Sequence, residues 1–205
     1  MLLMEVNRAC DTPLSFTATA RRGQIVRAAI ETIAEHGFAA ASFARIAERA
    51  ELSSTRLISY HFKDKKDLIT EVVVQVLSAL EEYVGTRTHG TTTARGALEA
   101  YLRANIEFAD TRRTEMGALL GVFTAGGFHI DAIEHDQVLS PIERILRDGQ
   151  AAGEFRAFDP YVMAAAVQRC VEGFPMALEA RPGLDADSYA TEIVTLFDLA
   201  TRRTS

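Results

Sequence analysis

The sequence has 205 residues, of which 48% are apolar and 24% charged, a composition typical of a soluble globular protein of one or two domains. Two distant cysteines, Cys10 and Cys170, exclude a disulfide-rich scaffold and favour a cytoplasmic location. No signal peptide is expected, and the longest charge-free stretch, residues 116–130, is too short for a membrane span. The net charge is −6, yet residues 1–66 carry 10 basic and 7 acidic side chains, which favours a nucleic-acid-binding head on an acidic interaction domain.

The N-terminal third of the chain predicts a tail followed by short helices. Residues 1–18 have no helical periodicity, so we expect a disordered tail there. An apolar stripe from Val26 to Ala34 predicts a helix that ends at Gly37, because glycine is favoured just past a last turn. Ser42 is the expected N-cap of the next helix, which buries Ile46 and its neighbours.

The rest of the chain shows the same helical period. Asp159, followed by Pro160, and Asp185 are the expected N-caps of the last two helices, and Pro175 is expected to kink the first of them. Further helices are expected over residues 65–84, 94–110, 114–124 and 130–152, with a loop over residues 85–90. No strand is expected. The sequence therefore predicts an all-α protein of about nine helices.

Residues 42–66 contain the features of a helix-turn-helix in order. A short amphipathic helix is followed by a tight turn at residues 51–53 and by a second short helix rich in small polar side chains. All three lysines of the chain, Lys63, Lys65 and Lys66, follow directly after an aromatic segment at residues 60–62. We expect a helix-turn-helix domain over residues 19–66 and a larger helical domain over residues 67–205.

The second short helix is expected to present a polar face to the major groove of DNA. Leu57 or Ile58, together with Phe62, would hold it on the core, which leaves Arg56 free to pair with guanine O6 and N7. Hydroxyl and basic side chains nearby suit bases or phosphates. The candidate DNA-binding residues are Ser42, Arg45, Ser53, Ser54, Thr55, Arg56, Ser59, Tyr60, His61 and Lys65.

The window from about Arg21 to Val72 resembles the N-terminal DNA-binding domain of the TetR family of bacterial transcriptional regulators. Members usually carry an Ala-Gly-Val-Ser turn, but residues 50–53 here are Ala-Glu-Leu-Ser, with Glu51 in place of the glycine. The spacing from the serine at position 53 to the phenylalanine at position 62 is also one residue longer than usual. Either Ser53 or Ser54 can cap the second helix, and capping by Ser54 restores the usual spacing.

The resemblance implies a ligand-responsive repressor that acts as a homodimer on a palindromic operator, with a C-terminal domain that binds the effector and dimerises through its last two helices. Apolar stripes on those helices suit pairing with a second copy, and equally suit the core of one chain. The candidate interface residues are Met163, Val167, Cys170, Phe174, Tyr189, Ile193, Leu196, Phe197 and Ala200.

The remaining candidates concern a small-molecule pocket. Small residues around position 121 leave room, and aromatic and polar side chains nearby could line an apolar pocket. These are Phe108, Met116, Phe123, Phe128, His129, Gln168 and Glu172. No catalytic, cofactor or metal motif is found, so we expect neither an enzyme nor a bound cofactor. The alternative function is a helical interaction or adaptor protein that does not bind DNA.

Overall fold

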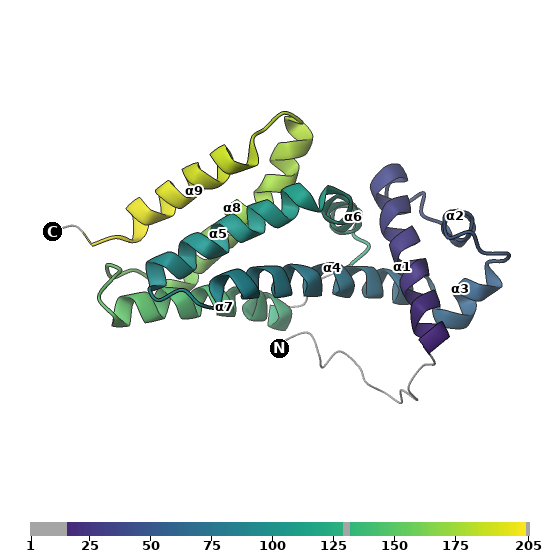
Figure 1. The fold of residues 1–205 in the computed structure, drawn as a ribbon, viewed down its shortest axis with the longest axis horizontal. Helices are drawn as coiled ribbons and strands as arrows, with labels where there is room; N and C mark the ends of the chain where they lie inside the picture. The colour runs from purple at the N-terminus through teal and green to yellow at the C-terminus, as the bar shows by residue number, and fades with distance from the viewer. Residues whose placement is uncertain (1–15, 129–131, 204–205) are drawn as a thin grey trace. The chain divides into compact units, whose positions relative to one another are not determined.

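The computed structural model describes residues 16–128 and 132–203, and within these ranges the chain forms nine α-helices (Figure 1). The only other pairing there is an isolated bridge between Phe155 and Arg202. The predicted all-α class is confirmed. None of the helices in the described ranges is long and apolar enough to cross a membrane. The helices are α1 (Phe16–His36), α2 (Phe43–Arg49), α3 (Arg56–His61), α4 (Lys65–Thr88), α5 (Ala94–Thr111), α6 (Arg113–Thr124), α7 (Ala132–Ala151), α8 (Pro160–Ala180) and α9 (Ala186–Thr201).

Local signals in the sequence set most of the helix ends. The Ser42 hydroxyl accepts a hydrogen bond from the Arg45 amide at 3.3 Å, and Asp159 and Asp185 cap α8 and α9 in the same way. Gly37, with a φ of 79°, ends α1 as predicted. Two limits were predicted wrongly. Residues 16–18, which were predicted to belong to the tail, form the first turn of α1, and the other tail residues lie outside the described part of the chain. Helix α4 continues three residues beyond Gly85, into the predicted loop.

The chain divides into two compact units, and the first is discontinuous in sequence. Unit 1 comprises Met1–Ser78 with Arg113–His129, and unit 2 comprises Ala79–Arg112 with Ile130–Ser205. Unit 1 therefore extends beyond the predicted boundary at residue 66. Helix α4 runs across that boundary without a break, and α6 packs into the same core as the helix-turn-helix. The fully buried side chains at its centre are Ile25, Ile33, Ile46, Ile58, Phe62 and Leu68.

The packing of α6 on α1 completes unit 1. Ala118 and Val122 of α6 are fully buried in the same apolar cluster as the helix-turn-helix residues. Gly121 faces Ile33 of α1, and a Cβ there would stand at an ordinary van der Waals distance of 3.5 Å from the Ile33 side chain. Of the small residues that suggested room for a ligand, Ala118 and Gly121 thus lie against the core of unit 1.

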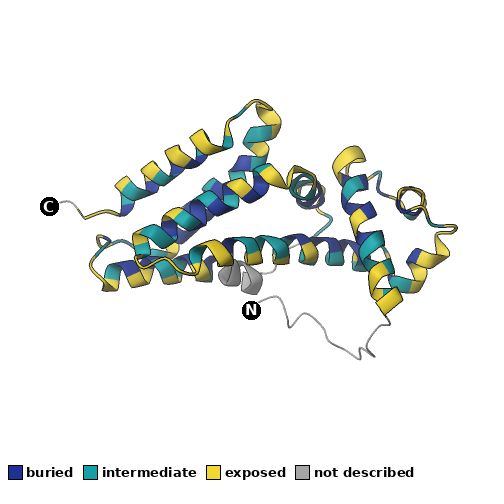
Figure 2. Cartoon of the chain, viewed as in Figure 1, coloured by how far each residue is buried: buried dark blue, intermediate teal, exposed yellow. Residues whose placement is uncertain are grey.

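Unit 2 is a helical layer in which α5 contacts α7, α8 and α9, and α7 also contacts α8. The stripes predicted for dimerisation contribute much of its core. Phe174 is fully buried and Phe197 is 4% exposed, and Val167 and Ile193 are buried as well. These four side chains are buried within one chain, so their packing supports the alternative that the stripes serve the core of one chain and gives no support to a dimer interface at these positions. The exposed large apolar side chains of α8 and α9 are instead Tyr161, Val162, Met176, Leu196 and Leu199. Exposed positions of the chain are yellow in Figure 2.

Glu51, in the turn between α2 and α3, has a φ of 51°, a left-handed conformation that favours glycine. Glu51→Gly should remove this strain and raise the free energy of unfolding by up to about 1 kcal/mol in chemical denaturation, part of the gain being offset by the entropy of glycine in the unfolded chain. Glu51→Ala keeps the Cβ and should give no such gain. An equal gain in both variants would assign the effect to the charge of Glu51 and not to its backbone.

Candidate nucleic-acid interface

Helix α3 is held on unit 1 by two apolar side chains and presents its other face to solvent. Ile58 and Phe62 are buried, whereas Leu57 is 36% exposed, so Ile58 is the residue that packs into the core. Successive residues of a helix are about 100° apart, so the direction opposite Ile58 belongs to Arg56 and Tyr60. Both are exposed, Tyr60 to 81%.

The start of α3 is capped by Ser54. Its hydroxyl accepts a hydrogen bond from the Arg56 amide at 3.1 Å, whereas Thr55, at the last position before the helix, makes no side-chain cap. The structure thus selects Ser54 from the two serines that the sequence left open. With this cap, Arg56 occupies the first turn of α3, on the face away from the core.

Arg22 of α1 fixes the other end of α3. Its Nη1 donates a hydrogen bond to the His61 carbonyl at 2.7 Å, and its Nη2 forms an ion pair with Glu71 of α4 at 2.6 Å. The guanidinium also lies 4.3 Å from the centre of the Phe62 ring. One side chain thereby connects three helices. Sequence reasoning missed Arg22, because an arginine in the first half of a helix has no local signal for a partner 39 residues away.

Helix α2 is tied to α1 in a similar way. Gln24 donates a hydrogen bond to the Ala50 carbonyl at 2.7 Å, and Arg49 pairs with both Glu31 and Glu35 of α1. Both helices of the helix-turn-helix are therefore fixed to a common support, which gives the exposed side chains of α3 defined positions.

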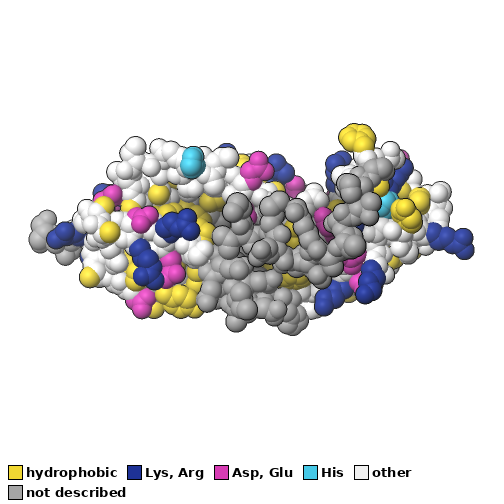
Figure 3. All heavy atoms as spheres, turned by 90° about the horizontal axis from the view of Figure 1, so that it is seen from below, with side chains coloured by type: hydrophobic (Ala, Val, Ile, Leu, Met, Phe, Trp, Pro, Cys, Tyr) yellow, Lys and Arg dark blue, Asp and Glu magenta, His cyan; other side chains and the backbone are white. Residues whose placement is uncertain are grey.

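The ten predicted DNA-binding residues all lie in unit 1, and eight of them are exposed: Ser42, Arg45, Ser53, Ser54, Thr55, Arg56, Ser59 and Tyr60. His61 and Lys65 are half-buried. Lys65 donates one hydrogen bond from its Nζ to the Phe38 carbonyl at 3.1 Å, which leaves two N–H groups for another acceptor. Lys63 and Lys66 are exposed beside it. Basic side chains project from several parts of the described surface (dark blue in Figure 3).

The half-buried His61 is surrounded by positive charge. Burial, followed by the charges of Arg22 and Arg21, lowers the pKa of His61 below its usual value. Its ring makes an edge-to-face contact with Tyr60 at 5.1 Å between centroids. His61 is therefore uncharged at neutral pH in the free protein and can take up a proton when an anion comes near.

The predicted ligand-binding residues are divided between the two units. Met116, Phe123 and Phe128 pack against the core of unit 1, while Phe108, Gln168 and Glu172 belong to unit 2. His129 lies outside the described residues. The first three side chains therefore serve a core, and the prediction that they line a pocket has no support in their packing.

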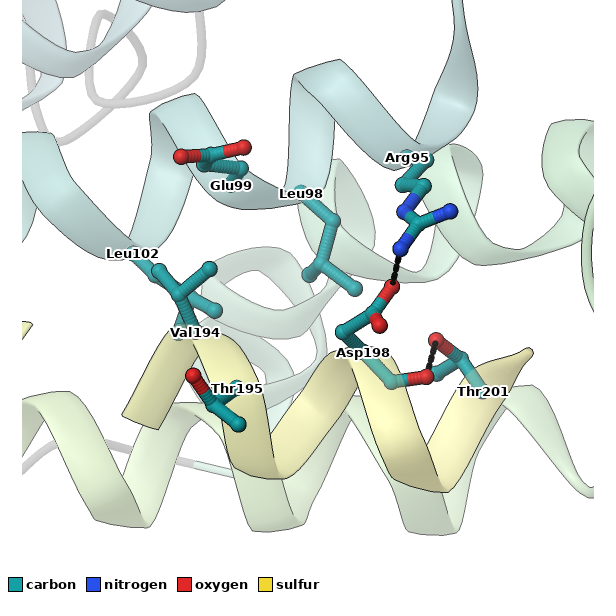
Figure 4. A pocket seen from close by; sticks show the side chains of 8 residues that line it. All are labelled: Arg95, Leu98, Glu99, Leu102, Val194, Thr195, Asp198 and Thr201. Atoms are coloured by element: carbon teal, nitrogen blue, oxygen red, sulfur yellow. Dashed lines mark hydrogen bonds and ion pairs between the residues drawn. The ribbon is translucent and has the colours of Figure 1, made fainter. Parts of the chain in front are cut away.

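A hollow of about 200 Å³ lies between α5 and α9 in unit 2, and none of these seven residues lines it (Figure 4). Arg95 and Asp198 form an ion pair at 2.5 Å across it, and Leu98 and Leu102 lie beside them. Small-molecule sites usually have about 300–1,000 Å³ and mostly apolar walls. The size and the charged lining thus argue against an effector site in this hollow.

A polar chain in unit 2 does contain two of the predicted residues, and it runs from the buried Tyr101 and Gln168 to the exposed Glu172. The Tyr101 hydroxyl donates to Gln168 Oε1 at 2.9 Å, and Gln168 Nε2 donates to Glu172 Oε1 at 2.8 Å. Burial, followed by the negative charge of Glu172, raises the pKa of the Tyr101 phenol. Phe108 is buried nearby in sequence on the same helix as Tyr101.

Comparison with known proteins also points to a helix-turn-helix in the N-terminal part of the chain. The model of the family "Bacterial regulatory proteins, tetR family" matches residues 25–72, the segment that forms most of α1 to the start of α4. Over these residues the chain carries the N-terminal domain of that family. A regulator from Stenotrophomonas maltophilia, HTH-type transcriptional regulator BetI, is 34% identical over 53% of this chain and 55% of its own length. The chain thus spans about half the length of that relative.

Two further likenesses extend beyond the N-terminal segment. The BetI regulator of Ectopseudomonas mendocina is 28% identical over 84% of this chain and 86% of its own length. A transcriptional regulator from Saccharomonospora viridis, solved in complex with choline, shares the fold with a TM-score of 0.78 at 22% identity, over 91% of this chain and all of that chain. The likeness in fold therefore extends to the helices of unit 2.

Arg22→Ala should lower the free energy of unfolding by about 1–2 kcal/mol, because it removes a hydrogen bond to the His61 carbonyl and an ion pair with Glu71. It should also raise the pKa of His61, since one of the charges that lowers it is lost. An NMR titration of the His61 ring measures this shift. Arg27→Ala, an exposed change on the same helix, should leave the titration unchanged, and an equal shift in both variants would contradict the local role of Arg22.

Proposed function

We propose that this chain is a sequence-specific DNA-binding transcriptional regulator, a ligand-responsive repressor that binds a palindromic operator as a homodimer. The observation that carries the proposal is the exposed polar face of α3, which is held rigidly by buried Ile58 and by the bond from Arg22 to the His61 carbonyl. A recognition helix needs both properties, because base contacts depend on side chains at fixed positions in the major groove.

Each exposed side chain has a role that its chemistry suits. Arg56 pairs with guanine O6 and N7 through two parallel hydrogen bonds, and Thr55 and Ser59 reach neighbouring bases or phosphates. The phosphate contacts fall to the residues around the helix: Ser42, Arg45, Ser53, Ser54, Tyr60, His61 and Lys65. A phosphate beside His61 would raise its lowered pKa, so binding should strengthen as the pH falls through the pKa of the bound state.

Arg56→Ala tests the sequence readout. It should relax the base preference at one position of each half-site and cost about 1–3 kcal/mol per contact, measured by titrating the protein against operators that differ at single base pairs. Arg147→Ala, an exposed arginine of unit 2, should change neither affinity nor preference. If Arg56→Ala weakened binding equally for all sequences, Arg56 would be a phosphate contact. No sequence preference in the unaltered protein would favour an adaptor without DNA binding.

The proposal of a homodimer is based on the exposed apolar side chains of α8 and α9. Met176 is 57% exposed, Leu196 54% and Leu199 52%, and Val162 extends the apolar surface along α8. Large exposed apolar side chains grouped on two helices mark an interaction surface. A second copy related by a two-fold axis would bury the same faces as a four-helix bundle and would present two recognition helices to one palindrome.

Leu199→Glu should give a folded but largely monomeric protein that no longer holds a palindromic site, because it places charge in the proposed interface. Sedimentation at micromolar concentration measures the assembly state. Phe16→Glu is the matched control, since Phe16 is also an exposed large apolar residue but lies on α1, and it should leave sedimentation unchanged. A wild-type protein that sediments as a monomer would remove the dimer and the symmetric operator with it.

The effector site is proposed around the hydrogen-bonded chain of Tyr101, Gln168 and Glu172 in unit 2, whose last member is exposed. The Gln168 carboxamide donates a hydrogen bond to the Glu172 carboxylate. A polar ligand could take the place of either group in this bond, so that no hydrogen bond would be lost on binding. Choline, which the regulator from Saccharomonospora viridis binds in its structure, is the first compound to add to the operator titration. Release of the operator by choline would support the site, provided that Glu172→Gln weakens that release.

A further inference from the structure

The recognition helix exposes one aliphatic side chain, Leu57, among polar ones. Leu57 is 36% exposed and lies outside the apolar cluster of unit 1, although the adjacent Ile58 is completely buried in that cluster. Along the helix surface it lies between Ser54, three residues before it, and Tyr60, three residues after it, and both are exposed. An apolar side chain on a surface that meets DNA either contacts an apolar group there or only excludes water from its polar neighbours.

The position of Leu57 on the helix directs it to the same groove as Arg56. With 100° between successive residues, Leu57 lies about 100° from Ile58, and Tyr60 lies a further 60° round on the same side. Arg56 and Tyr60 flank the direction directly opposite the core. Leu57, Arg56 and Tyr60 therefore share the half of α3 that faces away from unit 1.

The base edges of the major groove carry one apolar group, the C5-methyl group of thymine. We propose that Leu57 contacts a thymine methyl group beside the base pair that Arg56 reads, so that each half-site is recognised by one polar and one apolar contact. This inference rests on the proposed function. Burial of one methyl group corresponds to about a fourfold change in affinity, from about 0.8 kcal/mol at 1.4 kcal/mol per tenfold.

The test removes that methyl group from the DNA. A duplex is first selected from a random pool with the unaltered protein, and each thymine of one half-site is then replaced in turn by deoxyuridine. At one position the replacement should weaken binding of the unaltered protein about fourfold. The same replacement should have no effect on Leu57→Ala, which has already lost the contact. Leu57→Val, a smaller change, should retain part of the penalty.

Lys66→Ala is the control for weaker binding in general. Lys66 is an exposed basic residue next to the helix-turn-helix. Its removal should lower the affinity for every duplex and leave the deoxyuridine penalty unchanged, because its charged group does not contact a methyl group. Two results would overturn the inference while the proposed function stands: no thymine whose methyl group matters, or an equal penalty in the unaltered protein and in Leu57→Ala. Failure to select any preferred duplex would overturn the proposed function itself.

Discussion

The guanidinium of Arg22 is the interaction on which the DNA-binding unit depends. Helix α3 has six residues, far fewer than a helix needs to be stable in water on its own, so its shape and direction come from tertiary contacts. Arg22 supplies a hydrogen bond to the last turn of α3, an ion pair to α4 and a face-on contact with Phe62. A lysine could not replace it, because the planar guanidinium makes two directed bonds and a stacking contact at once.

The same support also explains the electrostatics of the interface. Arg22 forms an ion pair with Glu71, and its charge adds to burial in lowering the pKa of His61. Among the described residues, no buried side-chain nitrogen or oxygen lacks a hydrogen-bond partner. The interface can therefore offer several basic groups without the cost of desolvated, unsatisfied polar atoms.

Sequence reasoning succeeded where the cause is local and failed where it is tertiary. The caps Ser42 and Asp185 act over three residues, and the helical period of apolar side chains is visible within one helix, so the class and the helix ends could be predicted. The partner of an apolar stripe cannot be read in this way. The helical period of the apolar side chains shows which face of a helix is apolar, but it does not show what covers that face. The pattern around Phe197 therefore suits a dimer interface or the core of one chain, and the pattern of α6 suits either unit.

The packing of α6 on α1 has a consequence for synthesis of the chain. When residue 78 leaves the ribosome, the helix-turn-helix is complete in sequence, but the side chains of α1 that α6 covers have no partner yet. The missing piece follows after residues 79–112, and its last described residue is Phe128. At about 5–20 residues per second, a nascent DNA-binding unit waits roughly 3–10 s with apolar surface uncovered. Such transiently exposed apolar surface makes an unfinished unit prone to aggregation until α6 covers it.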